Sequence, residues 1–290
     1  MATCSEPVTV CITYRPPFDW HSLLAFIGDD CANGVDCGRN GNYSRTARFG
    51  DHQGHLTVCN DADRHCLNLT VSESLVPVIA SVIGSIKRLF DTASHPHGIA
   101  AHLGALAVDN PGTRVPGAFD PFEMSTRAIL GQQVSLKAAS TLAGRFAQRF
   151  GAPIDTPIPG LSRITPTADV VARATIDEIA SLGIVKTRAN AIIALANAVA
   201  SGAIRLDSST DPELVIRELV KLPGVGDWTA HYIAMRALRW PDAFPHTDLA
   251  IYKALGTRDP KTVLHTAEIW RPWRAYAAMH LWKRWEGMAK

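Results

Sequence analysis

A glycine-rich turn is the part of this chain whose residue types most directly predict binding. Residues 222–230 read LPGVGDWTA, and Gly224 and Gly226 let the backbone approach a ligand closely because they carry no Cβ atom. The N–H groups that open the following helix lie at the positive end of its dipole. Such a turn can bind a phosphate group through its backbone.

Asp248, in the segment after this turn, is the candidate for catalysis. Pro241 and Pro245 end the preceding helix, and a new helix is predicted to begin near Thr247. Asp248 would then lie in the first turn, where the helix dipole favours a negative charge. Two roles are open for it on these grounds: an ordinary helix cap, or a carboxylate used in a reaction.

Two helices must hold the turn in place. The segment 211–220 begins with Asp211 as a cap and Pro212 in its first turn, and the segment 226–239 follows the turn directly. On the second helix Trp228 and Tyr232 are four residues apart, so their rings share one face. Such a pair serves either core packing or a binding surface.

The rest of the chain divides into a short β region and a long helical region. Alternating or β-branched runs predict an antiparallel sheet, and longer apolar periods after about residue 97 predict helices. The predicted strands are Val8–Tyr14, Tyr43–Phe49, His55–Cys59 and Cys66–Val71. The predicted helices are 20–27, 74–90, 123–149, 167–182, 186–201, 211–220, 226–239, 247–255, 260–270 and 273–286. The Pro- and Gly-rich segment 151–166 is predicted to be a loop.

Composition indicates a soluble protein of more than one domain. The chain has 290 residues, of which 47% are hydrophobic and 19% charged, which suffices for sizeable buried cores. No apolar run is long enough to span a bilayer, and the N-terminus does not resemble a signal peptide. We therefore expect no membrane partner and a cytoplasmic location.

The cysteines predict reduced thiols rather than a metal or redox site. Six cysteines precede residue 67, at positions 4, 11, 31, 37, 59 and 66, and no pair has the Cys-x-x-Cys spacing. Cys59 and Cys66 flank a predicted turn and could be cross-strand neighbours. A disulfide between them is disfavoured in a reducing compartment.

Charge is unevenly spread along the chain. Residues 1–182 hold 14 Lys and Arg against 17 Asp and Glu, a net charge of −3, whereas residues 183–290 hold 15 against 10, a net charge of +5. The positive half contains the glycine-rich turn. This distribution is consistent with phosphate contact there, and equally with a solvated helical surface.

Motifs along nearly the whole chain resemble one family. The turn with its flanking helices resembles a helix-hairpin-helix, and its spacing to Pro-x-x-Asp is similar to that of the 3-methyladenine DNA glycosylase II family, the AlkA type within the helix-hairpin-helix DNA glycosylase superfamily. Further matching segments, in family order, are Tyr14–Trp20 (YRPPFDW), Arg88–Asp91 (RLFD), Arg127–Ser135 (RAILGQQVS), Trp270–Tyr276 (WRPWRAY) and Met279–Trp282 (MHLW).

The resemblance implies the fold. It is mostly α with an N-terminal α+β domain: a small antiparallel sheet plus two helical domains that carry a helix-hairpin-helix. The expected domains are a sheet-and-helix domain over 1–96, a helical domain made of 97–122 and 240–290, and a second helical domain over 123–239 with the helix-hairpin-helix at 211–239. A cleft between the two helical domains would face the hairpin and Asp248.

The resemblance also implies the function and its residues. It predicts a monofunctional DNA glycosylase that flips alkylated, cationic purines such as 3-methyladenine out of the duplex, hydrolyses the N-glycosidic bond and leaves an abasic site. Asp248 would be catalytic, either stabilising positive charge on the sugar or activating water. The predicted base pocket is Phe26, Trp228, Tyr232, Leu249 and Trp282, and the predicted DNA-backbone contacts are Gly224, Val225, Gly226 and Thr229.

Three positions depart from family patterns. Lyase-competent relatives carry a lysine in place of Trp228, so the indole argues against Schiff-base chemistry. Gln133 stands where the best-known member inserts a leucine wedge into the gap left by the flipped nucleotide. Leu249 stands where an aromatic residue can follow the aspartate, and this would open the pocket.

Two alternatives to a monofunctional enzyme are open. One is a bifunctional glycosylase and lyase for oxidised bases, against which the absent lysine counts. The other is a non-catalytic helix-hairpin-helix module that binds damaged or bent DNA, for which replacing Asp248 with Asn would change nothing.

Partners and cofactors follow from the same resemblance. The predicted partner is double-stranded DNA with damaged bases, bound by a monomer, in a bacterial cytoplasmic protein associated with the nucleoid. No organic cofactor or catalytic metal is expected, although a structural monovalent cation at the hairpin carbonyls is possible in the family. An iron–sulfur cluster, which some relatives hold with four C-terminal cysteines, is excluded because no cysteine lies there.

Overall fold

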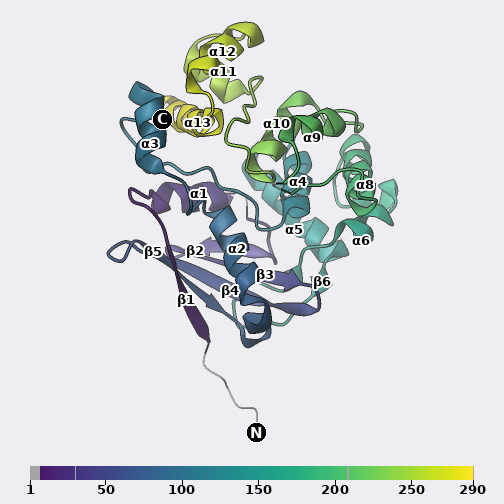
Figure 1. The fold of residues 1–290 in the computed structure, drawn as a ribbon. Helices are drawn as coiled ribbons and strands as arrows, with labels where there is room; N and C mark the ends of the chain where they lie inside the picture. Colours follow the sequence, from purple (N-terminus) through teal and green to yellow (C-terminus); the bar gives the residue numbers. More distant parts are fainter. Residues whose placement is uncertain (1–6, 30, 208, 290) are drawn as a thin grey trace.

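The computed structural model describes residues 7–29, 31–207 and 209–289. An antiparallel sheet forms one end of the molecule, and the helices from residue 121 onward form the other (Figure 1). This arrangement confirms the predicted fold class: a mostly helical protein with a small N-terminal sheet.

The sheet has five strands in the order β1-β5-β4-β3-β2, and every neighbouring pair is antiparallel. Its strands are β1 (Val8–Thr13), β2 (Asp36–Arg39), β3 (Asn42–Phe49), β4 (His52–Asp61) and β5 (Cys66–Val71). The prediction missed β2, a four-residue strand of Asp, Cys, Gly and Arg with little intrinsic β propensity. Strand β2 forms nevertheless, because its backbone pairs with β3.

Two helices cover the sheet. The buried faces of the strands pack against α1 (Trp20–Asp29) and α2 (Ile79–Leu89), which together with them form one hydrophobic core. Side chains at the centre of this core include Leu56, Val58, Leu67, Leu69, Leu23, Val82 and Ile86. The predicted helix 74–90 is a 3₁₀ turn, Glu73–Val78, followed by α2, because Pro77 lies inside the turn.

The remaining helices form the larger part of the molecule. They are α3 (Pro96–Leu103), α4 (Pro121–Leu130), α5 (Leu136–Phe150), α6 (Ala168–Ala172), α7 (Ile176–Ala180), α8 (Lys186–Ala200), α9 (Pro212–Leu219), α10 (Asp227–Arg236), α11 (Leu249–Leu255), α12 (Pro260–Ala267) and α13 (Arg274–Ala289). Helix α3 was not among the predicted helices. The predicted loop 151–166 contains two-residue strands, β6 (Ala152–Pro153) and β7 (Arg163–Ile164).

Two predicted long helices are each divided in two. The segment 123–149 is interrupted between α4 and α5, where Gln133 has a φ of 55° and the Ser135 side chain caps α5 by accepting from the Ala138 N–H. The segment 167–182 is interrupted between α6 and α7, where Thr175 and Glu178 form a capping box. In both cases a capping side chain starts a new helix inside a continuous apolar pattern.

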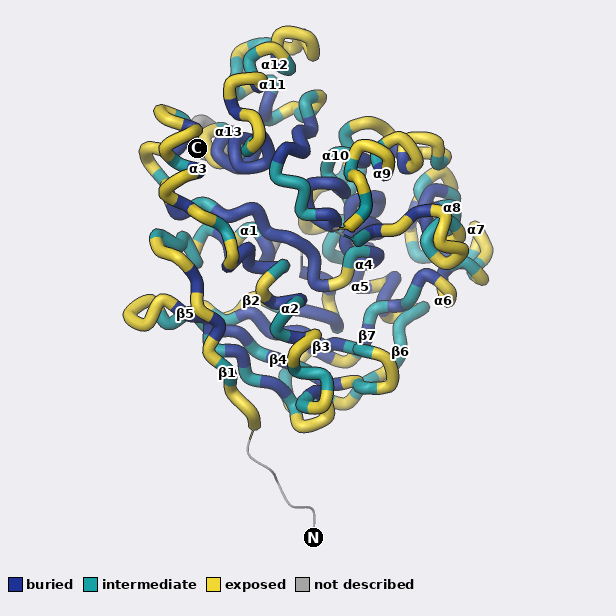
Figure 2. Tube along the Cα trace, viewed as in Figure 1, coloured by how far each residue is buried: buried dark blue, intermediate teal, exposed yellow. Residues whose placement is uncertain are grey.

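A second hydrophobic core joins the helices. It includes residues from both predicted helical domains, such as Leu103 of α3 and Ile233 of α10. In Figure 2 the buried stretches run from the sheet into the helices around α4. The predicted domain boundaries at residues 96, 122 and 239 stay predictions.

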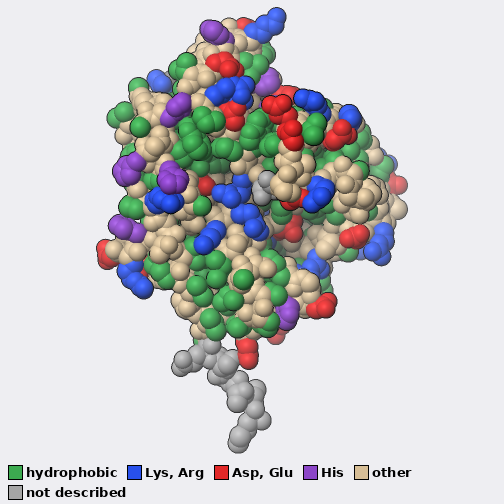
Figure 3. All heavy atoms as spheres, in the orientation of Figure 1, with side chains coloured by type: hydrophobic (Ala, Val, Ile, Leu, Met, Phe, Trp, Pro, Cys, Tyr) green, Lys and Arg blue, Asp and Glu red, His purple; other side chains and the backbone are tan. Residues whose placement is uncertain are grey.

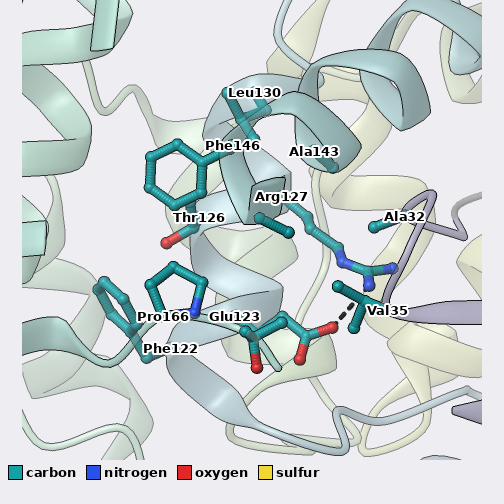
Figure 4. A pocket seen from close by; sticks show the side chains of 12 residues that line it. Ala32, Val35, Phe122, Glu123, Thr126, Arg127, Leu130, Ala143, Phe146 and Pro166 are labelled. Atoms are coloured by element: carbon teal, nitrogen blue, oxygen red, sulfur yellow. Dashed lines mark ion pairs between the residues drawn. The ribbon is translucent and has the colours of Figure 1, made fainter. Parts of the chain in front are cut away.

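A buried ion network joins the sheet to α4. Arg45 of β3 donates to Glu123 at 2.7 Å, and Arg127 contacts both Glu123 at 2.6 Å and Asp36 of β2 at 2.9 Å. Burial opposes ionisation of Asp36, but Arg127 and Arg45 lower its pKa below the ordinary value. The Arg127–Glu123 pair borders a small, mostly apolar cavity of about 20 Å³ between α4, α5 and the sheet (Figure 4).

Among the described residues, Cys11, Cys37, Cys59 and Cys66 are free thiols. In the sheet, Cys59 is paired with Asn68 and Cys66 with Asp61, so Cys59 and Cys66 do not face each other. Cys4 lies outside the described residues.

Within the described residues, no helix is both long and apolar enough to cross a membrane.

On the face drawn in Figure 3, Lys and Arg side chains gather in the hollow where the sheet end meets the helical end.

Candidate active site

Asp248 immediately precedes α11 and caps it. Its Oδ1 atom accepts hydrogen bonds from the backbone N–H groups of Ala250, at 2.8 Å, and Ile251, at 3.0 Å. The helix begins at Leu249 rather than near Thr247. Asp248 is therefore the N-cap residue, and its predicted position in the first turn of the helix is wrong. The capping role is therefore present, and it uses one of the two carboxylate oxygens.

Two tryptophans hold the same carboxylate from other helices. The indole Nε1–H of Trp228, on α10, donates to Asp248 Oδ2 at 2.9 Å, and that of Trp282, on α13, donates to Oδ1 at 3.1 Å. Four N–H donors from three elements thus fix the carboxylate. Sequence reasoning did not foresee these two indole bonds, because nothing in local spacing links residue 248 to residues 228 and 282.

The predicted aromatic residues form one cluster. The rings of Trp228 and Tyr232 stack with their centroids 5.1 Å apart and an interplanar angle of 8°. Tyr232 and Trp282 lie 6.2 Å apart, and Phe26 of α1 stacks on Trp282 at 6.1 Å. Helices α1, α10 and α13 therefore bring together side chains that are far apart in the sequence.

A buried arginine supports this cluster. Arg236, 2% exposed, donates through Nη1 to the hydroxyl of Tyr232 and through Nε to the carbonyl oxygen of Pro116. Its guanidinium carbon lies 5.2 Å from the ring centroid of Phe26 and 5.4 Å from that of Tyr232. It holds both rings in place through these contacts. Sequence reasoning missed it, although its spacing of four residues from Tyr232 was a usable signal.

A cavity of about 340 Å³ adjoins the cluster. Three of the predicted pocket residues, Phe26, Tyr232 and Trp282, are in its lining, with Leu136 and Lys283. Trp228 and Leu249 are not part of this lining: Trp228 lies between Tyr232 and Asp248, and Leu249 is exposed to solvent. The cavity is large enough to hold a purine-sized ligand against aromatic rings.

One pair of charged groups lies at the edge of the cavity. Lys283 donates to Asp19 Oδ2 at 3.1 Å and to Ser22 Oγ at 2.9 Å. Burial opposes ionisation of Asp19, but hydrogen bonds from Ser22, Asn110 and Lys283 lower its pKa to about 2. Asp19 is therefore a carboxylate at neutral pH, and it holds the Lys283 ammonium group.

The hairpin has the geometry that its glycines predicted. Gly224 has a φ of 78°, in the left-handed region, and Gly226 caps α10 with no side chain in front of the first helical turn. Val225 is buried between them. The backbone of this turn is therefore open for contact, whereas the side chain of Val225 packs inward.

Gln132 fastens the hairpin to the turn before α5. Its Nε2 atom donates to the carbonyl oxygen of Gly224 at 3.0 Å and to Thr229 Oγ1 at 2.9 Å. The Thr229 side chain is buried and engaged in this bond. The neighbouring Gln133 is exposed, and Leu136 beside it is 63% exposed while also lining the cavity. The wedge role of Gln133 stays a prediction.

Two carbonyl oxygens of the hairpin are candidate ligands for the predicted monovalent cation. Leu222 O accepts from the Val225 N–H at 3.1 Å, and Gly224 O accepts from Gln132. Each carbonyl oxygen has a second lone pair, which fits a cation ligand. The cation itself stays a prediction.

The fold and this site define a mostly helical protein with a glycine-rich hairpin and a base-sized cavity, and two family models specify the class. The AlkA N-terminal domain matches residues 9–120, and the HhH-GPD superfamily base excision DNA repair protein matches residues 126–271. The chain belongs to the HhH-GPD superfamily of base excision DNA repair proteins. This confirms the resemblance drawn from the motifs.

Individual relatives narrow the class further. The chain is 35% identical over 271 residues to DNA-3-methyladenine glycosylase 2 of Escherichia coli (strain K12), covering 93% of this chain and 95% of that protein. It is 36% identical over 288 residues to a probable bifunctional transcriptional activator/DNA repair enzyme AlkA of Mycobacterium tuberculosis, of which it spans 56%. Among solved structures, 3-methyladenine DNA glycosylase from Archaeoglobus fulgidus shares the fold, with a TM-score of 0.80 at 17% identity over 97% of this chain and 99% of that one.

Proposed function

We propose that this protein is a monofunctional DNA glycosylase that excises alkylated, cationic purines such as 3-methyladenine from double-stranded DNA. The observation that carries the proposal is the Asp248 carboxylate, held by the indoles of Trp228 and Trp282 beside an aromatic cavity. The family and the named activity of the Escherichia coli relative support it.

The cavity suits a flipped, positively charged base. A base inside a duplex must be rotated out at a cost of a few kcal/mol, and stacking on aromatic rings returns about 1–3 kcal/mol per base. Phe26, Tyr232 and Trp282 present such rings. A methylated purine carries positive charge, which the electron-rich faces of indole and phenol rings attract more than they attract a normal base.

Asp248 would act on the sugar. When the bond between C1′ and the base nitrogen breaks, the base leaves with the electron pair, becomes neutral, and leaves positive charge on the sugar. Oδ2 accepts only the Trp228 bond among the described contacts, whereas Oδ1 accepts three, so Oδ2 has room for a further interaction. Asp248 either stabilises the sugar cation or takes the proton of the water that adds to C1′.

A lyase reaction requires an amine, and the lysine that lines the cavity is already engaged. Trp228 occupies the position that carries a lysine in lyase-competent relatives. Lys283 lines the cavity, but its ammonium group is held by Asp19 and Ser22. A positively charged, hydrogen-bonded amine is a poor nucleophile, which supports hydrolysis without strand cleavage.

The hairpin would grip the DNA backbone. Gly224 and Gly226 keep the turn free of protruding side chains, and α10 begins without a side-chain cap, so its first N–H groups suit a phosphate. Gln133, exposed on the turn that Gln132 ties to the hairpin, would enter the gap left by the flipped base. A hairpin cation, a monomeric state and association with the nucleoid belong to the same proposal.

A base-release assay with Asp248→Asn tests the proposal. Asparagine caps a helix as well as aspartate does, so the variant keeps the cap of α11. It loses the charge and, because an amide NH2 group replaces Oδ2, also the hydrogen bond from Trp228. On duplex oligonucleotides with single defined lesions, we expect release of 3-methyladenine by the unaltered protein and a loss of roughly 10²-fold or more in the variant, with DNA affinity retained.

Two outcomes would contradict it. A non-catalytic DNA-binding module would release no base in either form and would bind DNA equally in both. Trapping of a covalent complex with abasic DNA by borohydride would instead indicate a lyase, with Lys283 as the first amine to replace.

A further inference from the structure

A cluster of two histidines and one aspartate lies beside the candidate active site. Asp227 is the first residue of α10, and His231 follows one helical turn later on the same face. His246 comes from the loop before α11, two residues ahead of Asp248. Three side chains from two separate segments therefore point at one position.

The separations suit a bound metal better than direct hydrogen bonds. His231 Nε2 lies 3.8 Å from Asp227 Oδ1, and His246 Nδ1 lies 3.4 Å from Asp227 Oδ2. One ligand atom from each residue lies within 4.8 Å of the other two. Zinc bound at about 2.0–2.1 Å in tetrahedral geometry separates its ligand atoms by roughly 3.4 Å.

An unsatisfied nitrogen points into the cluster. The Nδ1 atom of His246 is buried and has no hydrogen-bond partner among the described residues, although the Asp227 carboxylate is nearby. A buried polar atom without a partner is unfavourable and is normally satisfied by protein, water or an ion. A metal at the centre of the cluster would satisfy it.

The surroundings of the cluster suit a bound cation. Trp240 stacks over the ring of His231 with centroids 6.5 Å apart, which keeps one side of the cluster apolar. Arg274, which acts electrostatically on His231, donates two hydrogen bonds to the carboxylate of Asp242, at 2.7 and 2.8 Å. Its charge therefore does not take the place of a cation in the cluster.

We propose that Asp227, His231 and His246 bind one divalent transition-metal ion of the zinc class. A donor set of two imidazoles and one carboxylate matches the preference of such ions and leaves a fourth position for water. The side chain of Asp227 is 47% exposed, so this position can be reached from solvent.

The position of the site gives the ion a structural task. Asp227 directly precedes Trp228, and His246 lies in the loop that presents Asp248. An ion between them would tie the start of α10 to that loop, and so would hold the 2.9 Å bond from Trp228 to Asp248. The site is a positioning device outside the cavity, and it does not depend on which base is excised.

Metal titration of the full, tag-free, chelator-treated protein tests the proposal. We expect one Zn²⁺ per chain by calorimetry, and binding weakened by at least roughly tenfold in His246→Gln and in Asp227→Asn. His265→Gln, which changes an exposed histidine on α12, should bind as the unaltered protein does. The two cluster variants remove different ligands, so a folding defect in one leaves the other as a test.

Co²⁺ identifies the ligands. Bound by nitrogen and oxygen, it should show visible d–d bands without the near-ultraviolet thiolate charge-transfer band. Absence of saturable binding, binding by both cluster variants as tight as by the unaltered protein, or a thiolate band showing that cysteines hold the ion would each overturn the proposal.

Discussion

Asp248 carries two tasks with one carboxylate. Oδ1 serves the helix, through the backbone N–H groups of Ala250 and Ile251, and Oδ2 accepts from Trp228. The alternatives of cap and reactive group that its sequence position left open are therefore compatible. The same bonds that order the loop also fix where a negative charge stands relative to the cavity.

The indole bond from Trp228 should matter for rate more than for fold. In Trp228→Phe a ring remains to stack on Tyr232, but the N–H donor to Asp248 is lost. Hydrogen bonds to charged groups contribute about 1.5–3 kcal/mol, so we expect single-turnover excision to fall about 10- to 100-fold.

Tyr232→Phe is the matched control, because it keeps the ring and removes a hydroxyl that bonds to Arg236 rather than to Asp248. Equal rates for Trp228→Phe and the unaltered protein would mean that the indole N–H does not help to position the carboxylate.

Sequence reasoning found the aromatic residues and the acid, but not what connects them. Phe26, Trp228, Tyr232 and Trp282 were assigned through motifs, and the structure places them in one cluster. Arg236 and the Asp227 cluster were missed, although Tyr232 and His231 lie four residues from Arg236 and Asp227. Their other partners, Phe26 and His246, come from distant segments. Spacing within one helix reveals a shared face but not what packs against it.

At the level of elements, the hairpin depends on one backbone conformation. Gly224 has a φ of 78°, and a Cβ atom there would lie 3.2 Å from Ala191 Cβ and 3.4 Å from Thr187 O. We expect Gly224→Ala to lower the free energy of unfolding by about 1–2 kcal/mol and to weaken duplex binding, because the turn must adjust. Urea denaturation and a DNA-binding titration measure the two effects.

Gly226→Ala is the comparison within the same turn. Gly226 has a φ of −90°, and a Cβ atom there meets nothing within 4 Å, so stability should change little. If both variants were equally stable, the left-handed turn would not be a constraint on the hairpin.

The predicted helix-hairpin-helix at 211–239 was located well because the residues that start and end its helices are local signals. Asp211 caps α9, Pro212 opens it, and the glycines end the turn. The breaks at 131–135 and near Thr175 were missed because apolar periodicity continues across them. The helix boundaries lie at capping residues, and the sequence prediction followed the apolar periodicity instead of these caps.

For the whole molecule, the ion network under α4 is a polar connection between the two cores. Asp36 and Arg45 come from the sheet, and Glu123 and Arg127 come from α4. Composition gave no signal of this network. Pairing of charges across an interface depends on the tertiary fold, which no local pattern reports.

Removing one charge from this network should destabilise the protein. In Asp36→Asn the buried guanidinium of Arg127 loses part of its compensation, and we expect a loss of about 3–5 kcal/mol in urea denaturation at neutral pH. The pKa of Asp36 is lowered in the folded protein, so its contribution is present above the unfolded-state pKa and is lost as pH falls through the folded value.

The difference in free energy of unfolding between the unaltered protein and Asp36→Asn should therefore be constant from pH 7 to about 5 and should shrink only in stronger acid. A difference that grew as pH fell would contradict the ionised state of Asp36 in the folded protein.

The bonds from Gln132 to the hairpin have a mechanical consequence. One amide group contacts both Gly224 and Thr229, and the next residue along is Gln133. Under the proposed function, the hairpin binds the DNA backbone and the turn that carries Gln133 enters the base stack. Because Gln132 joins them, the two elements move as one rigid unit. Binding of the DNA backbone and testing of a base pair would then occur at the same time rather than one after the other.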